Sequence, residues 1–320
     1  MYNISVIIPN YNCVQWLPKV IESCFIQKYL HEIIIVDDKS IDNSWKVLQN
    51  LQKKHSKILK ILKNTKKGGN NARNYGFSKS SGNYIQWLDA DDFLLEGKFE
   101  NQIKKFDENS EIDIVYSDWY MDFYENKTKF IKRKERKKKQ YLDFTYEILS
   151  DNWSVPANYL LKREIAKKLH IKKAWNPNTK VGQDREYFTM AALLGAKFSY
   201  IHGFYCVYNI WNENSVSAMN FQERLKHQLV LEQKFRTEIN KNNYSKKNKI
   251  KYLAPLNAHS MNACFYNPQL TILNSFSFFN INWKIIHWKK HPFIPLIYIW
   301  QHLKYFINSL RKTNTNIFIL

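Results

Sequence analysis

Short apolar runs separated by amphipathic segments make up most of the first two hundred residues. Residues 4–8 and 32–36 are almost continuously apolar, which is typical of strands buried on both faces of a sheet. Similar runs predict further strands at residues 58–62, 84–88, 112–116, 153–161 and 198–208, with an interruption at Pro156.

Helical spacing of apolar residues fills the segments between these runs. Leu17, Val20 and Ile21 share one face of a helix predicted over residues 14–27, for which Asn12 is a suitable N-cap. Further helices are predicted from residue 42, after the basic glycine-containing turn at 66–74, and over 96–106 and 181–195. Alternating strands and helices predict an α/β fold with a mostly parallel central sheet and helices on both faces.

The pattern changes after residue 217. Apolar positions from 221 to 239 fit a long amphipathic helix, and the Lys- and Asn-rich segment 240–251 is predicted to be a linker or exposed turn. Residues 283–312 interleave aromatic and basic side chains. This segment is either an interfacial membrane segment or a helix packed against the main domain. No apolar run approaches the ~20 residues of a membrane-spanning helix.

Polar residues follow three of the predicted strands. These groups are residues 9–12, Asp37 with Asp38, and residues 89–92, where Asp89, Asp91 and Asp92 lie within four positions. Ligands bind at the carboxyl ends of strands in open α/β sheets. The three carboxylates predict either a site for Mg²⁺ or Mn²⁺, shared with substrate phosphates, or a solvated turn that caps a helix at Asp91 or Asp92.

Composition adds a strong positive charge. The chain has 320 residues, of which 44% are hydrophobic, and a formal net charge of +21, which favours polyanionic partners such as nucleotide phosphates or anionic lipids. The basic run 132–139 is predicted to be a mobile solvated loop, with contact to phosphate or anionic lipid as the alternative. Four widely spaced cysteines predict reduced thiols, and the absence of a charged leader predicts a cytoplasmic protein.

Five motifs, taken together and in order, resemble the inverting nucleotide-sugar glycosyltransferases of family 2. They are SVIIPNYN (5–12), IIIVDDKS (33–40), GGNNARNYG (68–76), YIQWLDADD (84–92) and GQDREYF (182–188). The resemblance covers about residues 3–217 and implies a GT-A fold. It implies a glycosyltransferase domain over residues 1–217, with a nucleotide-sugar half (1–115) and an acceptor half (116–217), followed by a helical extension over 218–320.

The resemblance also implies a role for each matching residue. Asp184 would be the catalytic base, Asp91 would bind a divalent metal (Mn or Mg), and Asp89 would approach the ribose or the metal. The donor site would comprise Pro9, Tyr11, Asp37, Asp38, Arg73, Asp89, Asp91 and Asp92. One departure stands at 209 and 211, where Asn209 and Trp211 replace the Arg and His that relatives often carry.

These implications predict a hexosyltransferase that uses a nucleotide-diphosphate sugar, and we expect the donor to be a UDP-sugar. The acceptor would be a glycan or lipid-linked hydroxyl in the synthesis of a surface polysaccharide such as capsule, O-antigen or lipooligosaccharide. The protein would work peripherally on the inner face of the cell membrane, against an anionic surface. A non-catalytic nucleotide-sugar-binding member is the first alternative. A nucleic-acid-binding protein is a weaker alternative, because carboxylates at the ligand edge would repel a phosphate backbone.

Overall fold

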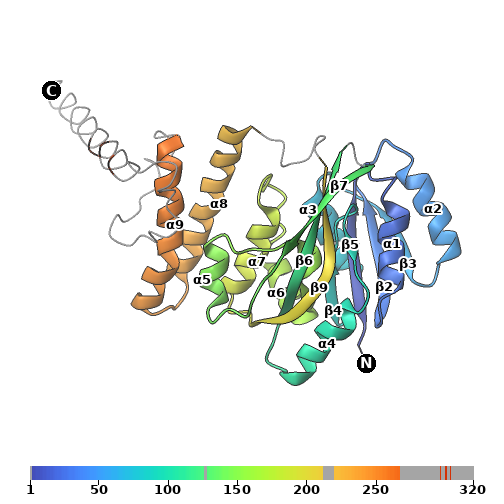
Figure 1. Ribbon diagram of the computed structural model, residues 1–320, viewed down its shortest axis with the longest axis horizontal. Coiled ribbons are helices and arrows are strands. Elements are labelled where there is room, and N and C mark those ends of the chain that lie inside the picture. Colours follow the sequence, from blue (N-terminus) through green and yellow to red (C-terminus); the bar gives the residue numbers. More distant parts are fainter. Residues whose placement is uncertain are drawn as a thin grey trace. The chain divides into compact units, whose positions relative to one another are not determined.

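The computed structural model describes residues 2–125, 128–211 and 220–266, together with residues 296, 300 and 303. Within these residues, nine strands form one sheet in the order β3-β2-β1-β4-β8-β6-β9-β5, with β7 beside β6 (Figure 1). The strands are β1 (Ile4–Asn10), β2 (Leu30–Asp37), β3 (Leu59–Lys63), β4 (Tyr84–Trp87), β5 (Phe93–Leu94), β6 (Ile114–Glu125), β7 (Lys129–Arg136), β8 (Leu160–Lys162) and β9 (Phe198–Trp211).

Helices connect the strands. The described helices are α1 (Leu17–Phe25), α2 (Ser44–Lys54), α3 (Gly69–Ser78), α4 (Lys98–Glu108), α5 (Phe144–Leu149), η1 (Pro156–Asn158), α6 (Arg163–Ile171), α7 (Gln183–Leu193), α8 (Phe221–Lys241) and α9 (Lys246–Tyr266). Strands β3, β2, β1 and β4 form a parallel block, and β6 is parallel to β9. Strands β5, β7 and β8 run antiparallel to their neighbours. The predicted α/β fold is confirmed, and its sheet is mixed, with four parallel and four antiparallel strand pairings among the described residues.

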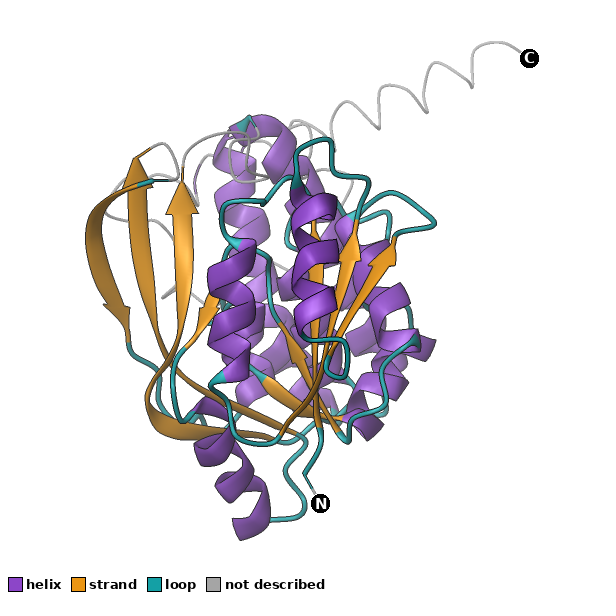
Figure 2. Ribbon diagram, turned by 90° about the vertical axis from the view of Figure 1, so that its right-hand side faces the viewer, coloured by secondary structure: helices purple, strands orange, loops and turns teal. Residues whose placement is uncertain are grey.

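Helices cover both faces of the parallel block, as Figure 2 shows. Val6 and Ile8 of β1 belong to the same apolar core as Leu17 of α1. The intervening residue Ile7 points to the other face, where α3 lies so close that a Cβ added to Gly76 would be 2.6 Å from the Ile7 Cγ2. Alternating side chains of one strand therefore enter two separate layers, which explains why the run is apolar throughout.

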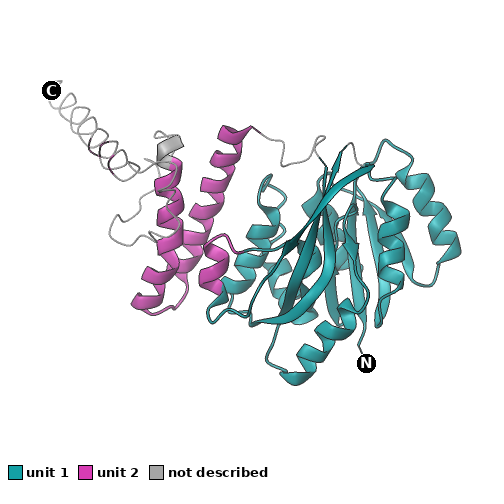
Figure 3. Cartoon of the chain, viewed as in Figure 1, with its two compact units in different colours: residues 1–144, 153–218 teal, residues 145–152, 219–320 magenta. Residues whose placement is uncertain are grey.

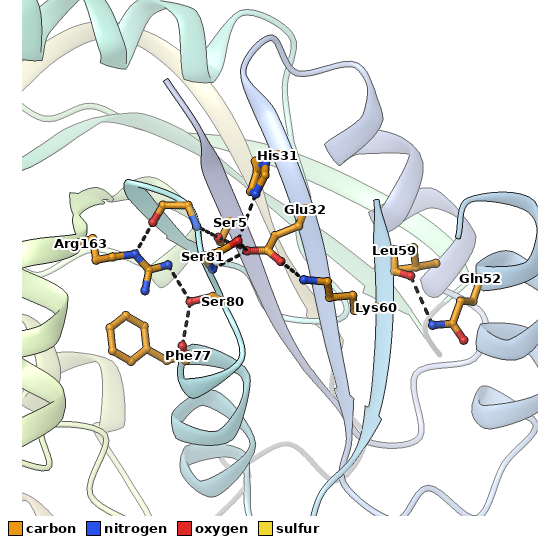
Figure 4. A network of polar contacts seen from close by, with 11 residues as sticks. Ser5, His31, Glu32, Gln52, Leu59, Lys60, Phe77, Ser80, Ser81 and Arg163 are labelled. Atoms are coloured by element: carbon orange, nitrogen blue, oxygen red, sulfur yellow. Dashed lines mark hydrogen bonds and ion pairs between the residues drawn. The ribbon is translucent and has the colours of Figure 1, made fainter. Parts of the chain in front are cut away.

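A buried carboxylate ties the amino-terminal edge of the sheet together (Figure 4). The Oε1 of Glu32 accepts hydrogen bonds from Ser5 Oγ (2.7 Å) and from Ser81 N and Oγ (2.6 and 2.8 Å), while Lys60 Nζ donates to Oε2 at 2.6 Å. Burial by itself would raise the pKa of Glu32, but these hydrogen bonds outweigh it and lower the pKa to about 2. The carboxylate thereby links β1, β2, β3 and the turn before β4.

The structure corrects two predictions in the basic and aromatic middle of the chain. The run 132–139 is not a mobile loop in its first half, because residues up to Arg136 form the edge strand β7, paired with β6. All eight residues of β7 are exposed, so the solvated character is confirmed. Residues 153–161 do not form a strand broken at Pro156. Pro156 instead begins the short helix η1, and the strand β8 starts only at Leu160.

Two further predictions about helix ends are wrong. Asn12 does not cap α1, whose first turn follows Trp16; its Oδ1 accepts a hydrogen bond from Ile41 N at 2.9 Å instead. Within the segment 240–251 only residues 242–245 lie outside a helix, because α8 ends at Lys241 and α9 begins at Lys246. In both places a long-range backbone contact or a helix of mixed composition overrides the local signal.

The chain divides into two compact units, coloured separately in Figure 3. The larger comprises residues 1–144 and 153–218, and the smaller comprises residues 145–152 and 219–320. The expected donor and acceptor halves of the larger unit stay a prediction. Cys13, Cys24 and Cys206 are reduced thiols, as expected, whereas the side chain of Cys264 lies outside the described residues.

The smaller unit contains a buried polar cluster. Arg236 of α8 donates to Asn257 Oδ1 (2.6 Å) and to Ser260 Oγ (3.0 Å) of α9. His259 Nδ1 lies 3.0 Å from Glu232 Oε1, and its Nε2 lies 3.3 Å from Asp151 Oδ2. The predicted aromatic and basic segment 283–312 falls almost entirely outside the described residues. Among the helices that are described, none combines the length and apolarity needed to span a bilayer.

Candidate functional site

The three carboxylates at residues 89–92 lie in a turn between two strands. Strand β4 ends at Trp87, and β5 begins at Phe93 directly after the acidic turn. The following helix, α4, starts only at Lys98 with Gly97 as its N-cap. The alternative that Asp91 or Asp92 caps a helix is therefore wrong, and the clustering of negative charge needs another explanation.

Strand β9 fixes this acidic turn. The backbone N–H of Asn209 donates to Asp92 Oδ1 at 3.0 Å, and the side-chain amide of Asn209 donates to the Asp91 carbonyl. The indole Nε1 of Trp211 donates to Asp91 Oδ2 at 2.9 Å. The two residues that depart from the usual family sequence thus hold the two carboxylates from one side, by hydrogen bonds rather than by positive charge.

Asp92 is the most buried member of the group. It is fully buried, and its Oδ2 has no hydrogen-bond partner within the part of the chain described here. Burial, followed by the charges of Asp91 and Asp89, raises the pKa of Asp92 well above its usual range. A buried carboxyl oxygen without a partner beside two further carboxylates is a place where a cation or a proton is favoured.

Arg73 joins three elements at the other side of the turn. From α3, its Nη2 forms an ion pair with Asp89 Oδ1 at 2.6 Å. Its Nη1 donates to Gln183 Oε1, the first residue of α7, at 3.2 Å, and its guanidinium lies 4.4 Å from the centre of the Trp175 ring. Arg73 is only 6% exposed. Its positive charge therefore holds Asp89 in place and also offsets part of the negative charge of the turn.

Asp184 is the second residue of α7, adjacent to this ion pair. Burial, followed by the charge of Asp89, raises its pKa to about 7, and the nearby Arg73 moderates the rise. The side chain keeps partial solvent exposure. No hydrogen bond to its carboxylate is formed by any described residue, and the N-cap of α7 is Gly182, at φ 73°. The carboxyl group is therefore not used as a helix cap and is poised to exchange a proton near neutral pH.

Tyr208 is a residue of this site that the sequence did not point to. It precedes Asn209 on β9, and burial together with Asp92, Asp184, Asp89 and Asp91 raises the pKa of its phenol. Four carboxylates thus lie close enough to act on one hydroxyl group. The signal in the sequence was the position of Tyr208 immediately before the departure at 209, which became meaningful only once β9 was seen beside the acidic turn.

The other predicted carboxylates lie at the ends of β2 and have structural partners. Asp37 Oδ1 accepts from Asn10 Nδ2 at 2.9 Å. Asp38 accepts from Asn64 Nδ2 at 2.7 Å and from the backbone N–H of Gly68, at 2.9 and 2.8 Å for its two oxygens. Gly68 has φ 119°, a conformation that favours glycine. Asp38 therefore shapes the turn that leads into α3 and hence the position of Arg73.

Tyr11 offers a different kind of surface. Its ring is 46% exposed, follows β1 and Pro9, and has Lys67 Nζ 5.5 Å from its centre. An exposed aromatic ring beside a cation suits a stacked base next to a phosphate. Among the predicted site residues, the structure thus groups Asp89, Asp91, Asp92, Asp184 and Arg73 electrostatically. Asp37 and Asp38 belong to a separate hydrogen-bond network at the end of β2.

The acidic turn fits a divalent metal in a limited way. No group of three or more His, Cys, Asp or Glu side chains surrounds a common point within the described ranges. Mg²⁺ and Mn²⁺, however, are commonly held by one or two carboxylates with the remaining positions filled by substrate phosphates and water. Asp91 and Asp89 supply oxygen ligands of this kind, and the buried carboxyl group of Asp92, with its unpartnered Oδ2, lies in the same turn.

Comparison with known proteins gives the family. The model of the family described as "Glycosyl transferase family 2" matches residues 5–170, more than half of the chain. Among solved structures, residues 1–349 of TarS from S. aureus in complex with UDP-GlcNAc have a TM-score of 0.63 at 16% identity, covering 94% of this chain and 89% of that one. Mannosyltransferase PcManGT from Pyrobaculum calidifontis, solved with GDP-Man and Mn²⁺, has a TM-score of 0.57 at 15% identity, with coverages of 94% and 87%.

Curated relatives match a shorter stretch. The Escherichia coli protein WfaP, named as a UDP-Glc:alpha-D-GlcNAc-diphosphoundecaprenol beta-1,3-glucosyltransferase, is 38% identical over 120 residues, which is 37% of this chain and 47% of WfaP. A Campylobacter jejuni GalNAc(5)-diNAcBac-PP-undecaprenol beta-1,3-glucosyltransferase is 39% identical over 110 residues, 34% of this chain and 36% of that protein. The chain matches less than half the length of each of these relatives.

Proposed function

The chain belongs to glycosyl transferase family 2, and from this premise we propose that it moves a sugar from a UDP-sugar to a hydroxyl group with inversion. The observation that carries the proposal is Asp184, a carboxyl group without a hydrogen bond from the described residues whose pKa is raised to about 7 beside the acidic turn. Transfer to a hydroxyl needs a base that is deprotonated at neutral pH and near the reacting carbon. Asp184 meets the first requirement, and its neighbours supply a site for the donor.

In this proposal the donor lies along the carboxyl edge of the parallel block. The exposed ring of Tyr11, after Pro9, stacks on the base, and Asp37 and Asp38 keep the turn at Gly68 in shape beside it. Asp91, assisted by Asp89, would hold a divalent metal, with Asp92 as a buried supporting carboxyl group. The metal, when bound, neutralises the charge that develops on the leaving diphosphate.

Asp184 then acts on the acceptor. Its carboxylate accepts the proton of the acceptor hydroxyl while the oxygen attacks the anomeric carbon opposite the leaving nucleotide, so that the anomeric configuration is inverted. Arg73 fixes two residues around this carboxylate: its Nη2 lies 2.6 Å from Asp89 Oδ1, and its Nη1 lies 3.2 Å from Gln183 Oε1. Its charge also keeps the pKa of Asp184 from rising further. A base with a pKa near 7 is ionised for about half of the molecules at neutral pH.

The names of the relatives support a proposal for the acceptor and the setting. Two of them are named for acceptors linked to undecaprenol through a diphosphate, and a third is named as the teichoic acid biosynthesis protein GgaB of Bacillus subtilis. We therefore place this hexosyltransferase in surface-polysaccharide synthesis, acting on a glycan or lipid-linked acceptor. Such acceptors put the enzyme at the inner, anionic face of the cell membrane.

A non-catalytic member that only binds a nucleotide sugar is the second candidate. It is favoured by Asn209 and Trp211, which replace the Arg and His found in many relatives and already engage Asp91. A Trp211→His variant tests their effect on metal. If the indole replaces a metal ligand, the histidine variant binds Mn²⁺ several-fold more tightly in calorimetry, whereas an unchanged affinity would mean that position 211 does not face the metal.

A panel of nucleotide sugars with Mn²⁺ tests the proposed activity. We expect slow hydrolysis of at least one UDP-sugar by the wild-type protein, and loss of turnover with retained donor binding in Asp184→Asn. The matched control is Glu164→Gln, because Glu164 is also the second residue of a helix, α6, and is exposed. Absence of turnover with every donor, or full activity in Asp184→Asn, would contradict the proposal.

A further inference from the structure

The edge strand β7 is an unusual surface for a sheet edge. Among the described strands it pairs with β6 alone; all of its eight residues are exposed, and five of them are Lys or Arg. Charged side chains, especially lysine, keep an edge strand from pairing with another chain, which is one use for this charge. Five cations on one short strand, followed by Lys137, Lys138 and Lys139, suggest a further use for the charge.

Some of these cations have carboxylate partners. Arg133 forms a two-pronged ion pair with Asp122, at 2.6 and 2.7 Å, and Lys129 lies 3.0 Å from Glu125. Lys137 lies 3.3 Å from Glu135. Arg133 and its partner project from one face of the β6–β7 ribbon, because residues directly opposite in an antiparallel pair share a face.

The opposite face presents a row of cations that have no acid beside them. We call Lys132, Lys134 and Arg136 the basic row; their register partners on β6 are Phe123, Met121 and Trp119. Lys132 Nζ and Lys134 Nζ lie 5.5 and 5.3 Å from the centre of the Phe123 ring. Within the residues that the structure describes, no carboxylate forms an ion pair with any member of the row. Alternate residues of a strand are about 7 Å apart, so the row is a line of evenly spaced charges.

Apolar side chains are exposed at the outer end of the same strand. Phe130 is 52% and Ile131 is 57% exposed, and Ile131 is the extra residue at an irregularity in the β6–β7 register. Phe130 lies opposite Tyr124 and touches its ring, with 5.8 Å between centres, so it projects from the ion-paired face of the ribbon and not from the face of the basic row. Basic residues next to exposed apolar side chains are the combination that binds the interface of an anionic bilayer, where lipid phosphates attract the cations and the apolar groups enter the acyl boundary.

The position of the ribbon connects this surface with the proposed site. Strand β6 lies between β7 and β9, and its register pairs Asp122 with Asn209 and Tyr124 with Trp211. Asn209 and Trp211 are the residues that hold the acidic turn. Since neighbouring strands are about 4.8 Å apart, β7 lies roughly 10 Å from the strand that carries them.

We propose that this protein docks on an anionic phospholipid bilayer with the outer edge of β7, which carries the basic row on one face, Phe130 on the other and Ile131 at the irregularity between them. Docking there brings the carboxyl edge of the sheet to the headgroup region, where the diphosphate and first sugars of a lipid-linked acceptor would lie. This second statement rests on the proposed function, whereas the docking itself does not. A nucleic acid is the competing polyanion, and oligonucleotide binding is therefore one of the outcomes of the test.

Cosedimentation of the full chain with vesicles tests the docking. The vesicles contain phosphatidylcholine alone or phosphatidylcholine with roughly one third phosphatidylglycerol. We expect binding only to the anionic vesicles. The variant Lys132→Gln/Lys134→Gln/Arg136→Gln is expected to bind about a hundredfold more weakly, because each cation near an anionic surface contributes about fivefold. Ile131→Ser is expected to weaken binding further at high salt, where charge is screened.

A variant with the same loss of charge elsewhere provides the control. Lys53→Gln/Lys54→Gln/Lys57→Gln removes three exposed cations near the end of α2 and is expected to change vesicle binding no more than a few-fold. Equal losses in both triple variants would show an effect of net charge and overturn the proposal. So would vesicle binding that survives in the basic-row variant, or a wild-type protein that binds single-stranded oligonucleotides but no vesicles.

Donor hydrolysis in solution keeps this test separate from the proposed function. The basic-row variant is expected to hydrolyse a UDP-sugar as the wild type does, because none of its three altered residues belongs to the proposed donor site. If neither protein hydrolyses any donor but the vesicle results hold, the proposed function fails and the docking surface stands. If donor hydrolysis is normal but the wild type does not bind vesicles, the docking surface fails and the proposed function stands.

Discussion

Replacing Asp184 by Asn is expected to stabilise the protein while it removes the proposed base. The ordinary pKa of 3.8 is raised to about 7 in the folded state, mainly because burial disfavours the charged carboxylate. A shift of this size corresponds to at most about 4 kcal/mol of lost stability above pH 7. Asparagine has nearly the same shape and carries no charge, so it avoids this cost.

The pH dependence of the difference follows from the direction of the shift. Below pH 3.8 the carboxyl group is protonated in both states, so the wild type suffers no penalty. Between pH 3.8 and 7 the unfolded chain has released the proton but the folded protein retains it, and the stability of the wild type falls as the pH rises. Above pH 7 both states are ionised and the deficit is constant. The advantage of Asp184→Asn should therefore grow from pH 4 to pH 7 and then level off.

Thermal unfolding at several pH values, with chelator present to exclude metal, measures this advantage. At pH 8 the midpoint of Asp184→Asn should exceed that of the wild type by roughly 10 °C, and at pH 4 the two midpoints should nearly coincide. Glu164→Gln, at the equivalent position of α6, should show no such pH-dependent gain. A difference between Asp184→Asn and wild type that does not vary with pH would refute the reasoning that the carboxylate is buried at an electrostatic cost.

Three further substitutions test the packing around the sheet. Glu32→Gln should lower the free energy of unfolding by about 3 kcal/mol at neutral pH, because the pKa of Glu32 is lowered to about 2 in the folded protein. This loss should shrink as the pH falls from 4.5 to 2, which measurements of the free energy of unfolding at acid pH can check. Lys98 is fully buried and its pKa is lowered to about 7. Between pH 7 and 10 the free energy of unfolding of the wild type should therefore rise by about 1.4 kcal/mol per pH unit relative to that of Lys98→Met. Urea unfolding measures this difference, and a difference that does not change with pH would contradict burial of the amine. Gly76→Ala should destabilise by about 2 kcal/mol in urea unfolding, because its Cβ would meet Ile7 Cγ2 at 2.6 Å and Val36 Cγ2 at 3.2 Å; an unchanged midpoint would mean that α3 can move away from the sheet.

The sequence predicted the parts of the fold that depend on local pattern. The apolar runs of β1 and β2 are buried on both faces, as their lack of alternation indicated. The acidic turn was found because Asp is rare at the end of an apolar strand. Asp184 came from the family resemblance, and its raised pKa then followed from burial and from Asp89, which no local pattern contains.

The contacts that define the candidate site were harder to foresee, because they join residues far apart in the chain. Arg73 and Gln183 are 110 positions apart, and Trp211 and Asp91 are 120 positions apart. Neither pair follows from spacing or composition. The same reason explains β7, since a run of charged residues has low strand propensity and becomes a strand only through its register with β6.

The path of the chain through its two units affects how the protein can be divided. Residues 145–152 belong to the smaller unit but are inserted between two segments of the larger one. Ile148 and Leu149 in this insertion are completely buried. A truncation after residue 218 would leave the insertion behind without the helices of its own unit, and would expose apolar surface on the remaining fragment. We therefore expect a fragment that ends at residue 218 to aggregate unless residues 145–152 are removed or replaced by a polar loop as well.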